Sequence, residues 1–194
     1  MIKVLHVLTD SNIGGAGTYV ATCLEYCDRN RARQTVLLPR GSAAVGLIKG
    51  SGADIIEADI APDKSLDFKS ISVIRSYIKK GRYDIVHAHG SASARIATRG
   101  LALSVFTKHT LSYAGGGIKG LINKIIYRGL GGYAIAVSQA AFDNLVSLGF
   151  DKRRIYIVKN GVGDIGVPST DLHNKCKISY THIIVNYFIN HKSI

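Results

Sequence analysis

Residues 1–20, MIKVLHVLTDSNIGGAGTYV, place an apolar run at Met1–Leu8 ahead of a polar loop and the glycines of Gly14-Gly15-Ala16-Gly17. The pattern predicts a strand that runs through a glycine loop into a helix beginning at Thr18. Such a junction leaves backbone N–H groups unpaired at the helix N-terminus, where the helix dipole is positive. Open α/β sheets bind ligands at this edge, so we expect the loop to meet a phosphate or a polar sugar.

The loop matches the dinucleotide-binding fingerprint only in part. That fingerprint needs Gly-x-Gly-x-x-Gly and an acidic residue at the end of the second strand. Here Val20 takes the third glycine position, and the expected second strand ends in Pro39-Arg40. These departures weaken the hypothesis of a dehydrogenase-type nucleotide site, and a tight turn without a ligand is the plain alternative.

Composition limits the size of the fold and the kind of partner. The 194 residues are 46% apolar, which suits one substantial core and is short for two full domains. The 25 Lys and Arg against 13 Asp and Glu give a formal charge of +12, which favours anionic partners. Because the bases are spread along the chain without interleaved aromatic residues, we expect no nucleic-acid binding.

The spacing of the cysteines and the sequence of the N-terminus both bear on the cellular compartment of the protein. Cys23 and Cys27 lie one helical turn apart and Cys176 is distant, so no disulfide framework is expected. The N-terminus lacks the layout of a signal peptide, and no apolar run is long enough to span a bilayer. We expect a cytoplasmic protein, with peripheral contact at the inner membrane face as an option.

Strand-like and helix-like segments alternate strictly up to residue 158. The expected strands are 1–8, 35–38, 54–57, 83–89, 104–108, 133–137 and 155–158. The expected helices are 18–29, 43–49, 65–80, 91–101, 118–130 and 138–148. This alternation predicts an α/β fold: a doubly wound, mostly parallel, Rossmann-like sheet of about seven strands with helices on both faces.

Five stretches carry a family resemblance through their order and spacing. They are Gly14-Gly15, Asp84-Ile85-Val86-His87-Ala88-His89, Lys108-His109-Thr110, Ala136-Val137-Ser138 with Asn144-Leu145, and Lys159-Asn160-Gly161-Val162. Together they are similar to the N-terminal half of the retaining, family 4 glycosyltransferases of GT-B architecture. The resemblance implies two Rossmann-like domains across a cleft, with the acceptor on the N-terminal domain and the nucleotide-sugar donor on the other.

The resemblance also implies roles for individual residues. It places Gly14, Gly15 and Ala16 against the donor phosphates or the acceptor, and His109 as the catalytic residue beneath the transferred sugar. The implied acceptor-binding residues are Asn12, Thr18, His89, Arg95 and Tyr113. It implies no metal and no cofactor besides the nucleotide-sugar co-substrate.

The chain departs from the family pattern near its C-terminus. Gly163 stands between the Asn-Gly-Val motif and Asp164, and Tyr187 stands where the family usually has a phosphate-binding arginine. We therefore expect an N-terminal domain at 1–162, hinged at Asn160 and Gly161, and a linker with the stub of a donor domain at 163–194. Such a chain, from a truncated gene or from one half of a split enzyme with a separate donor-domain chain, is expected to be inactive alone.

Two local features have competing interpretations. His87 and His89 share one face of a strand, but no nearby cysteine or acidic cluster completes a metal site, so hydrogen-bonded histidines are expected. The apolar stripe of 118–130, with Lys119, Lys124 and Arg128 beside it, suits either an anionic membrane or the sheet, and packing on the sheet is favoured.

Two functional hypotheses follow from these observations. The first is transfer of a hexose to a glycan or lipid-linked acceptor in surface polysaccharide synthesis. The second is a non-catalytic module that binds a glycan or a partner protein.

Overall fold

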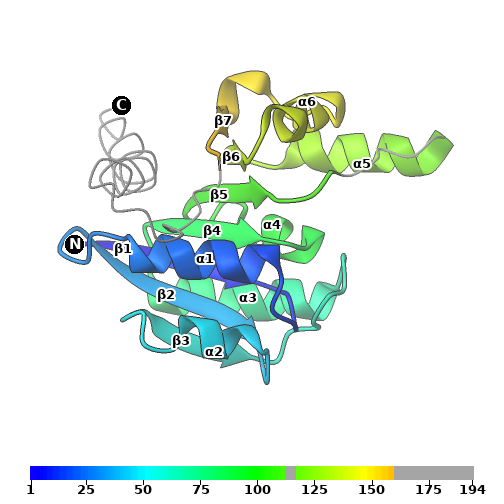
Figure 1. The fold of residues 1–194 in the computed structure, drawn as a ribbon. Coiled ribbons are helices and arrows are strands. Elements are labelled where there is room, and N and C mark those ends of the chain that lie inside the picture. The colour runs from blue at the N-terminus through cyan, green and yellow to red at the C-terminus, as the bar shows by residue number, and fades with distance from the viewer. Residues whose placement is uncertain (112–116, 160–194) are drawn as a thin grey trace.

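The computed structural model describes residues 1–111 and 117–159, which form one parallel sheet with helices on both faces (Figure 1). The strands are β1 (Ile2–Leu8), β2 (Ala32–Pro39), β3 (Asp54–Ala58), β4 (Ile85–His89), β5 (Leu103–Lys108), β6 (Tyr133–Ala136) and β7 (Ile155–Ile157). The α-helices are α1 (Gly15–Glu25), α2 (Ala44–Ile48), α3 (Phe68–Gly81), α4 (Ala92–Thr98), α5 (Gly117–Gly129) and α6 (Gln139–Ser147). The predicted fold class is confirmed.

The sheet has its topological switch between β1 and β4. The strand order is β3-β2-β1-β4-β5-β6-β7, and every pairing is parallel. The chain therefore winds outward from β1 in one direction and from β4 in the other. The loops after these two strands diverge, and this divergence opens a crevice at their carboxyl ends.

Each face of the sheet has its own apolar core, because successive strand side chains point to opposite faces. One core joins the sheet to α1 and α2 through Leu8, Val36, Leu38, Val20, Leu24 and Ile48. The other joins it to α3, α4 and α6 through Leu5, Leu37, Val86, Phe106, Ile74, Ala94 and Leu145. The alternation places His6, His87 and His89 on the face that α1 covers.

Helix α5 differs from the prediction that its apolar stripe packs on the sheet. Ile118 is 77% exposed, and Leu121, Ile122 and Ile125 are 59%, 50% and 59% exposed. The helix is anchored near its C-terminal end instead, where Tyr127 joins the core and is only 5% exposed. The expectation was wrong because periodicity identifies an apolar face but does not say what covers it.

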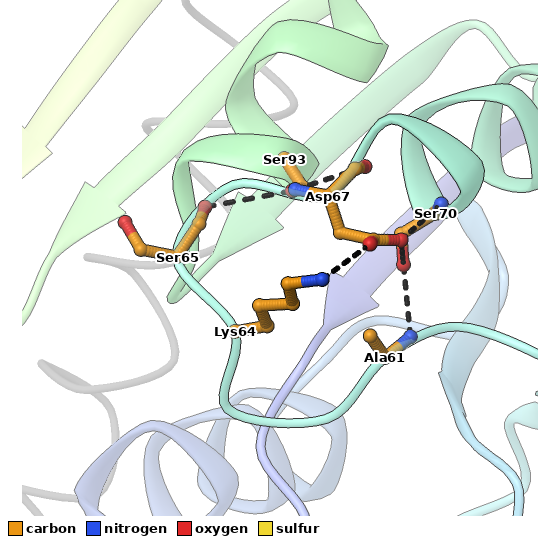
Figure 2. Close-up of polar contacts among 6 residues, drawn as sticks. All are labelled: Ala61, Lys64, Ser65, Asp67, Ser70 and Ser93. Carbon is orange, nitrogen blue, oxygen red and sulfur yellow. Dashed lines mark hydrogen bonds and ion pairs between the residues drawn. The ribbon is translucent and has the colours of Figure 1, made fainter.

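The segment between β3 and α3 is fastened to the start of α3. The Asp67 carboxylate caps α3 by accepting from the backbone N–H of Ser70 at 2.8 Å, and it pairs with Lys64 at 2.9 Å (Figure 2). The backbone N–H of Ala61 donates to the Ser70 hydroxyl at 2.8 Å. The contacts of Asp67 with Ser70 and Lys64 lower its pKa to about 2, with the Ser70 backbone bond as the largest cause.

A serine of α4 ties the same segment to the neighbouring helix. The backbone N–H of Asp67 donates to the Ser93 hydroxyl at 2.7 Å, and the backbone N–H of Ser93 donates to the Ser65 carbonyl at 3.0 Å (Figure 2). The segment that carries Asp63 and Ser65 is thereby held at the carboxyl edge of the sheet.

Candidate functional site

A pocket of about 500 Å³ opens at the carboxyl ends of β1, β4 and β5. It is lined by Thr9, Asp10, Gly15, Ala16, Asp63, Ser65, Gly90, Ser91, Ala92, Arg95, Thr107, Lys108, His109 and Thr110. A smaller hollow of about 110 Å³ lies near Met1, Arg29 and Arg33. Only the larger pocket has the size of a small-molecule site, and it lies at the switch point where open α/β sheets bind ligands.

The start of α1 gives the pocket a backbone wall. Gly14 precedes the helix, and no side chain among the described residues caps it. A Cβ atom at Gly14 or Gly15 would meet no protein atom within 4 Å, so packing of the described chain does not demand glycine there. Uncapped first-turn N–H groups beside open space suit an anion or a polar oxygen.

Two acidic residues lie on one side of the pocket. The Asp63 carboxylate accepts from the backbone N–H of Ser11 at 3.2 Å and from the Ser11 hydroxyl, and Asp63 itself has a left-handed φ of 55°. Burial raises the pKa of Asp10, and the charge of Asp63 adds to the increase. These carboxylates can accept hydrogen bonds from sugar hydroxyls.

Two cationic residues share the ring of Tyr127 on another side. Arg95 stacks over this ring at 5.2 Å and over Phe106 at 5.8 Å, and it donates to the Gly90 carbonyl at 3.1 Å. Lys108 donates to the Tyr127 hydroxyl at 3.2 Å. Burial lowers the pKa of both cations, and the Arg95 Nε atom is buried without a partner in the described part of the chain. A ligand anion would recover part of this desolvation cost.

Histidines form a buried group behind the pocket. His6, His87 and His89 are fully buried, while His109 reaches the pocket. Burial lowers the pKa of His6 and of His109 to about 4, and it lowers the pKa of His87 and His89 well below the usual value. All four rings are therefore neutral at pH 7.

The geometry of this group also bears on metal binding. One nitrogen from each of His6, His87 and His89 lies within 4.8 Å of the others, close enough for one ion. Two of these rings already share a hydrogen bond of 3.2 Å, and the three residues supply no negative charge to offset a buried divalent cation. The arrangement favours a hydrogen-bonded core.

The structure brings part of the predicted site together. The predicted residues that line the pocket are Gly15, Ala16, Arg95 and His109. Three others lie nearby in the chain but outside the lining: Asn12, Gly14 and Thr18. His89 is one hydrogen bond behind His109. Tyr113, Asn160 and Gly161 lie outside the described residues, so the acceptor role of Tyr113 and the hinge stay predictions.

Sequence reasoning did not select Asp10, Asp63 or Lys108. Asp10 follows β1 and Lys108 ends β5, so their position at the carboxyl edge was a usable signal. Asp63 reaches the pocket through the long segment before α3, and no local pattern marks that path.

None of the helices in residues 1–111 and 117–159 has the length and hydropathy that a membrane crossing needs.

Comparison with known proteins adds a family and a fold. Residues 13–164 match the family model described as Glycosyltransferase Family 4. Curated protein sequences give no significant match. The structure of HepE from Anabaena in complex with UDP and glucose matches with a TM-score of 0.64 at 16% identity, over 84% of this chain and 45% of that one.

Two further solved structures have the same fold. A glycosyltransferase from Rickettsia africae matches with a TM-score of 0.64 at 22% identity, over 92% of this chain and 49% of that one. A UDP-N-acetylglucosamine 2-epimerase from Rickettsia bellii matches with a TM-score of 0.57 at 15% identity, over 94% of this chain and 48% of that one. The chain thus spans just under half the length of these proteins.

Proposed function

The chain belongs to glycosyltransferase family 4, and we propose that it supplies the acceptor side of a retaining transfer of a hexose from a nucleotide-sugar to a glycan or lipid-linked acceptor. The observation that carries the proposal is the pocket at the switch point, where carboxylates, cations and His109 converge. The structure of Anabaena HepE holds UDP and glucose, which supports a nucleotide-sugar as the donor. Surface polysaccharide synthesis is the setting that suits such an acceptor.

The charges of the pocket favour an acceptor that carries a phosphate. Arg95 and Lys108 are desolvated cations on one ring, and they would bind a phosphate next to the sugar. Asp10 and Asp63 would accept from sugar hydroxyls, and His109 would contact the hydroxyl nearest the reacting carbon. A lipid-linked sugar phosphate has this combination of groups.

The proposed division of labour places donor binding in a second unit. Residues 1–162 would form the acceptor domain, and 163–194 would form the linker and the start of a donor domain. Stabilising the departing nucleotide phosphate is the main electrostatic task of such a transfer, and we assign it to that second unit. We therefore expect no transfer by these residues alone, and sugar transfer from UDP-glucose by the isolated chain would contradict this assignment.

The exposed face of α5 supports peripheral membrane contact at the cytoplasmic face. Ile118, Leu121, Ile122 and Ile125 form an exposed apolar stripe, and the exposed Lys124 and Arg128 lie beside it. An apolar helix face flanked by cations binds the interface of an anionic membrane. This contact would bring the pocket close to a lipid-linked acceptor.

One observation favours the second candidate, a non-catalytic binding module. The lining brings carboxylates, cations and His109 together from residues 9–110, and these groups can hydrogen-bond a sugar phosphate. A protein with these residues alone could hold a glycan without transferring to it.

Calorimetric titration with glucose 1-phosphate and with glucose tests the acceptor proposal. We expect glucose 1-phosphate to bind more tightly, and the variant Arg95→Gln to lose that preference by about tenfold or more, because a charged hydrogen bond is removed. Arg99→Gln, on the exposed end of the same helix, is the matched control and should bind as the unchanged chain does. Equal affinity for the two ligands, or equal losses in both variants, would contradict a phosphate site at Arg95.

A further inference from the structure

A continuous chain of hydrogen bonds crosses the sheet beneath the pocket. Gln34 Oε1, on β2, lies 2.9 Å from His6 Nε2, on β1. His6 Nδ1 lies 3.2 Å from His89 Nε2, and His89 Nδ1 lies 3.3 Å from His109 Nε2. The path therefore connects a residue remote from the pocket with a ring that lines it.

The proton positions along this path follow from one fixed end. The amide oxygen of Gln34 only accepts, so the proton of neutral His6 is on Nε2 and its Nδ1 is an acceptor. His89 must then donate from Nε2 and accept at Nδ1, and His109 must donate from Nε2. The remaining nitrogen, His109 Nδ1, carries a lone pair.

We propose that Gln34, acting through His6 and His89, is a positioning residue that fixes the tautomer of His109, so that His109 offers Nδ1 to the ligand as a hydrogen-bond acceptor. The assignment of a ligand hydroxyl as the donor to Nδ1 rests on the proposed function; the tautomer itself does not. His109 Nδ1 makes no hydrogen bond with the described part of the chain, which leaves it available.

The surroundings keep the path intact at neutral pH. Burial disfavours protonation of the three rings, and an added proton would turn an acceptor nitrogen into a donor and break one link. The ring of Tyr19 packs against His89 and edge-on against His109, at 5.8 Å and 4.9 Å between centroids. His109 is thereby held in place by a ring contact as well as by its hydrogen bond.

The orientation of the Gln34 amide decides the direction of the path. Its Nε2 lies 2.9 Å from the sulfur of Cys27 on the side opposite His6. A rotated amide would donate to His6 and reverse every later bond, which would place a proton on His109 Nδ1. His109 would then donate to the ligand, as a phosphate oxygen requires. The direction of the path therefore determines whether this nitrogen prefers a hydroxyl or an anion.

Nitrogen-15 NMR of the histidine rings in the ligand-free chain at pH 7 tests the inference. We expect His109 to show a protonated Nε2 and an unprotonated Nδ1, with the same assignment for His6 and His89. Because no sugar is present, the result does not depend on whether the proposed acceptor binds. A proton on His109 Nδ1 in the unchanged chain would overturn the inference.

Matched variants distinguish an effect of the hydrogen-bond path on His109 from an effect of packing among the buried rings. His6→Phe breaks the path and should shift both His109 nitrogen signals toward the average of the two tautomers, whereas His87→Phe removes an adjacent buried ring outside the path and should leave them unchanged. Gln34→Leu should reproduce the effect of His6→Phe from farther away, and it serves if His6→Phe fails to fold. Equal responses to His6→Phe and His87→Phe would overturn the inference. So would stoichiometric Zn²⁺ binding that removes the His6 and His89 N–H signals, because it would indicate a metal centre.

Discussion

The backbone N–H of Ser91 donates to the hydroxyl of Thr9 at 3.2 Å, although 82 positions separate the two residues in the chain. This bond joins the loop after β1 to the loop after β4, and both loops line the pocket. A specific hydrogen bond thus joins the two loops at the switch point.

Replacement of Gly90 by alanine should disrupt this junction. Gly90 has a φ of 90°, and a Cβ there would stand 2.9 Å from Thr9 Oγ1 and 3.1 Å from Asp10 Oδ1. We expect Gly90→Ala to lower the free energy of unfolding by about 1–3 kcal/mol in urea titrations. Gly46→Ala, in α2, should be neutral or stabilising, because no atom of residues 1–111 or 117–159 lies within 4 Å of the added Cβ. Equal effects of the two changes would contradict the assigned geometry.

The buried histidines predict a pH dependence of stability. The pKa of His6 and of His109 is about 4 in the folded chain, whereas an ordinary histidine, as in the unfolded chain, has a pKa of 6.5. The unfolded chain therefore binds more protons than the folded chain between about pH 4 and pH 6.5. The contribution of these histidines to the free energy of unfolding should be fully present above pH 6.5. It should fall as the pH drops toward 4, by up to about 1.4 kcal/mol per pH unit for each histidine. Urea midpoints measured between pH 7.5 and pH 5 provide the check. A flat profile would exclude this linkage, and His6→Phe should reduce its slope.

Asp67 should matter as a cap more than as a charge. Asp67→Ala removes the acceptor of the Ser70 N–H, so it should lower Tm and loosen the segment that carries Asp63. Asp67→Asn keeps an acceptor oxygen but loses the negative charge and the ion pair with Lys64, so its Tm should fall less than that of Asp67→Ala. Calorimetric melts decide the matter, and equal losses in both variants would assign the effect to charge.

Vesicle sedimentation tests the role of α5. We expect the chain to bind anionic vesicles at physiological salt, and the double variant Ile122→Asn with Ile125→Asn to weaken binding by about tenfold or more, since both side chains are exposed. Phe68→Asn changes another exposed apolar residue on α3 and is the control. Binding that is absent, or lost equally in the control, would remove the membrane proposal.

The sequence was sufficient for the fold because its signals are local. All seven strands were placed within a few residues, since buried parallel strands are short apolar runs separated by helical periods. Helix α1 begins at Gly15, earlier than predicted, because glycine is tolerated in a first turn. The error at α5 has the opposite origin, since the partner of an apolar face is a tertiary property.

The site could be predicted only in part, because some of its contacts depend on tertiary structure. His109 directly follows β5, where the edge rule applies, and Arg95 lies in α4, the helix that follows β4. The link from Gln34 to His109 depends on the register of β2, β1 and β4, in which Val4 pairs with Gln34 and His6 pairs with His87. No spacing along the chain encodes that relationship.

The most direct test of the acceptor-domain proposal is an NMR titration of the nitrogen-15-labelled chain with glucose 1-phosphate, read at the backbone amides. We predict saturable shifts concentrated at Gly15, Ser91 and His109, which line the pocket from the start of α1 and from the loops after β4 and β5. Shifts confined to residues outside this pocket, or no shifts at millimolar glucose 1-phosphate, would contradict it.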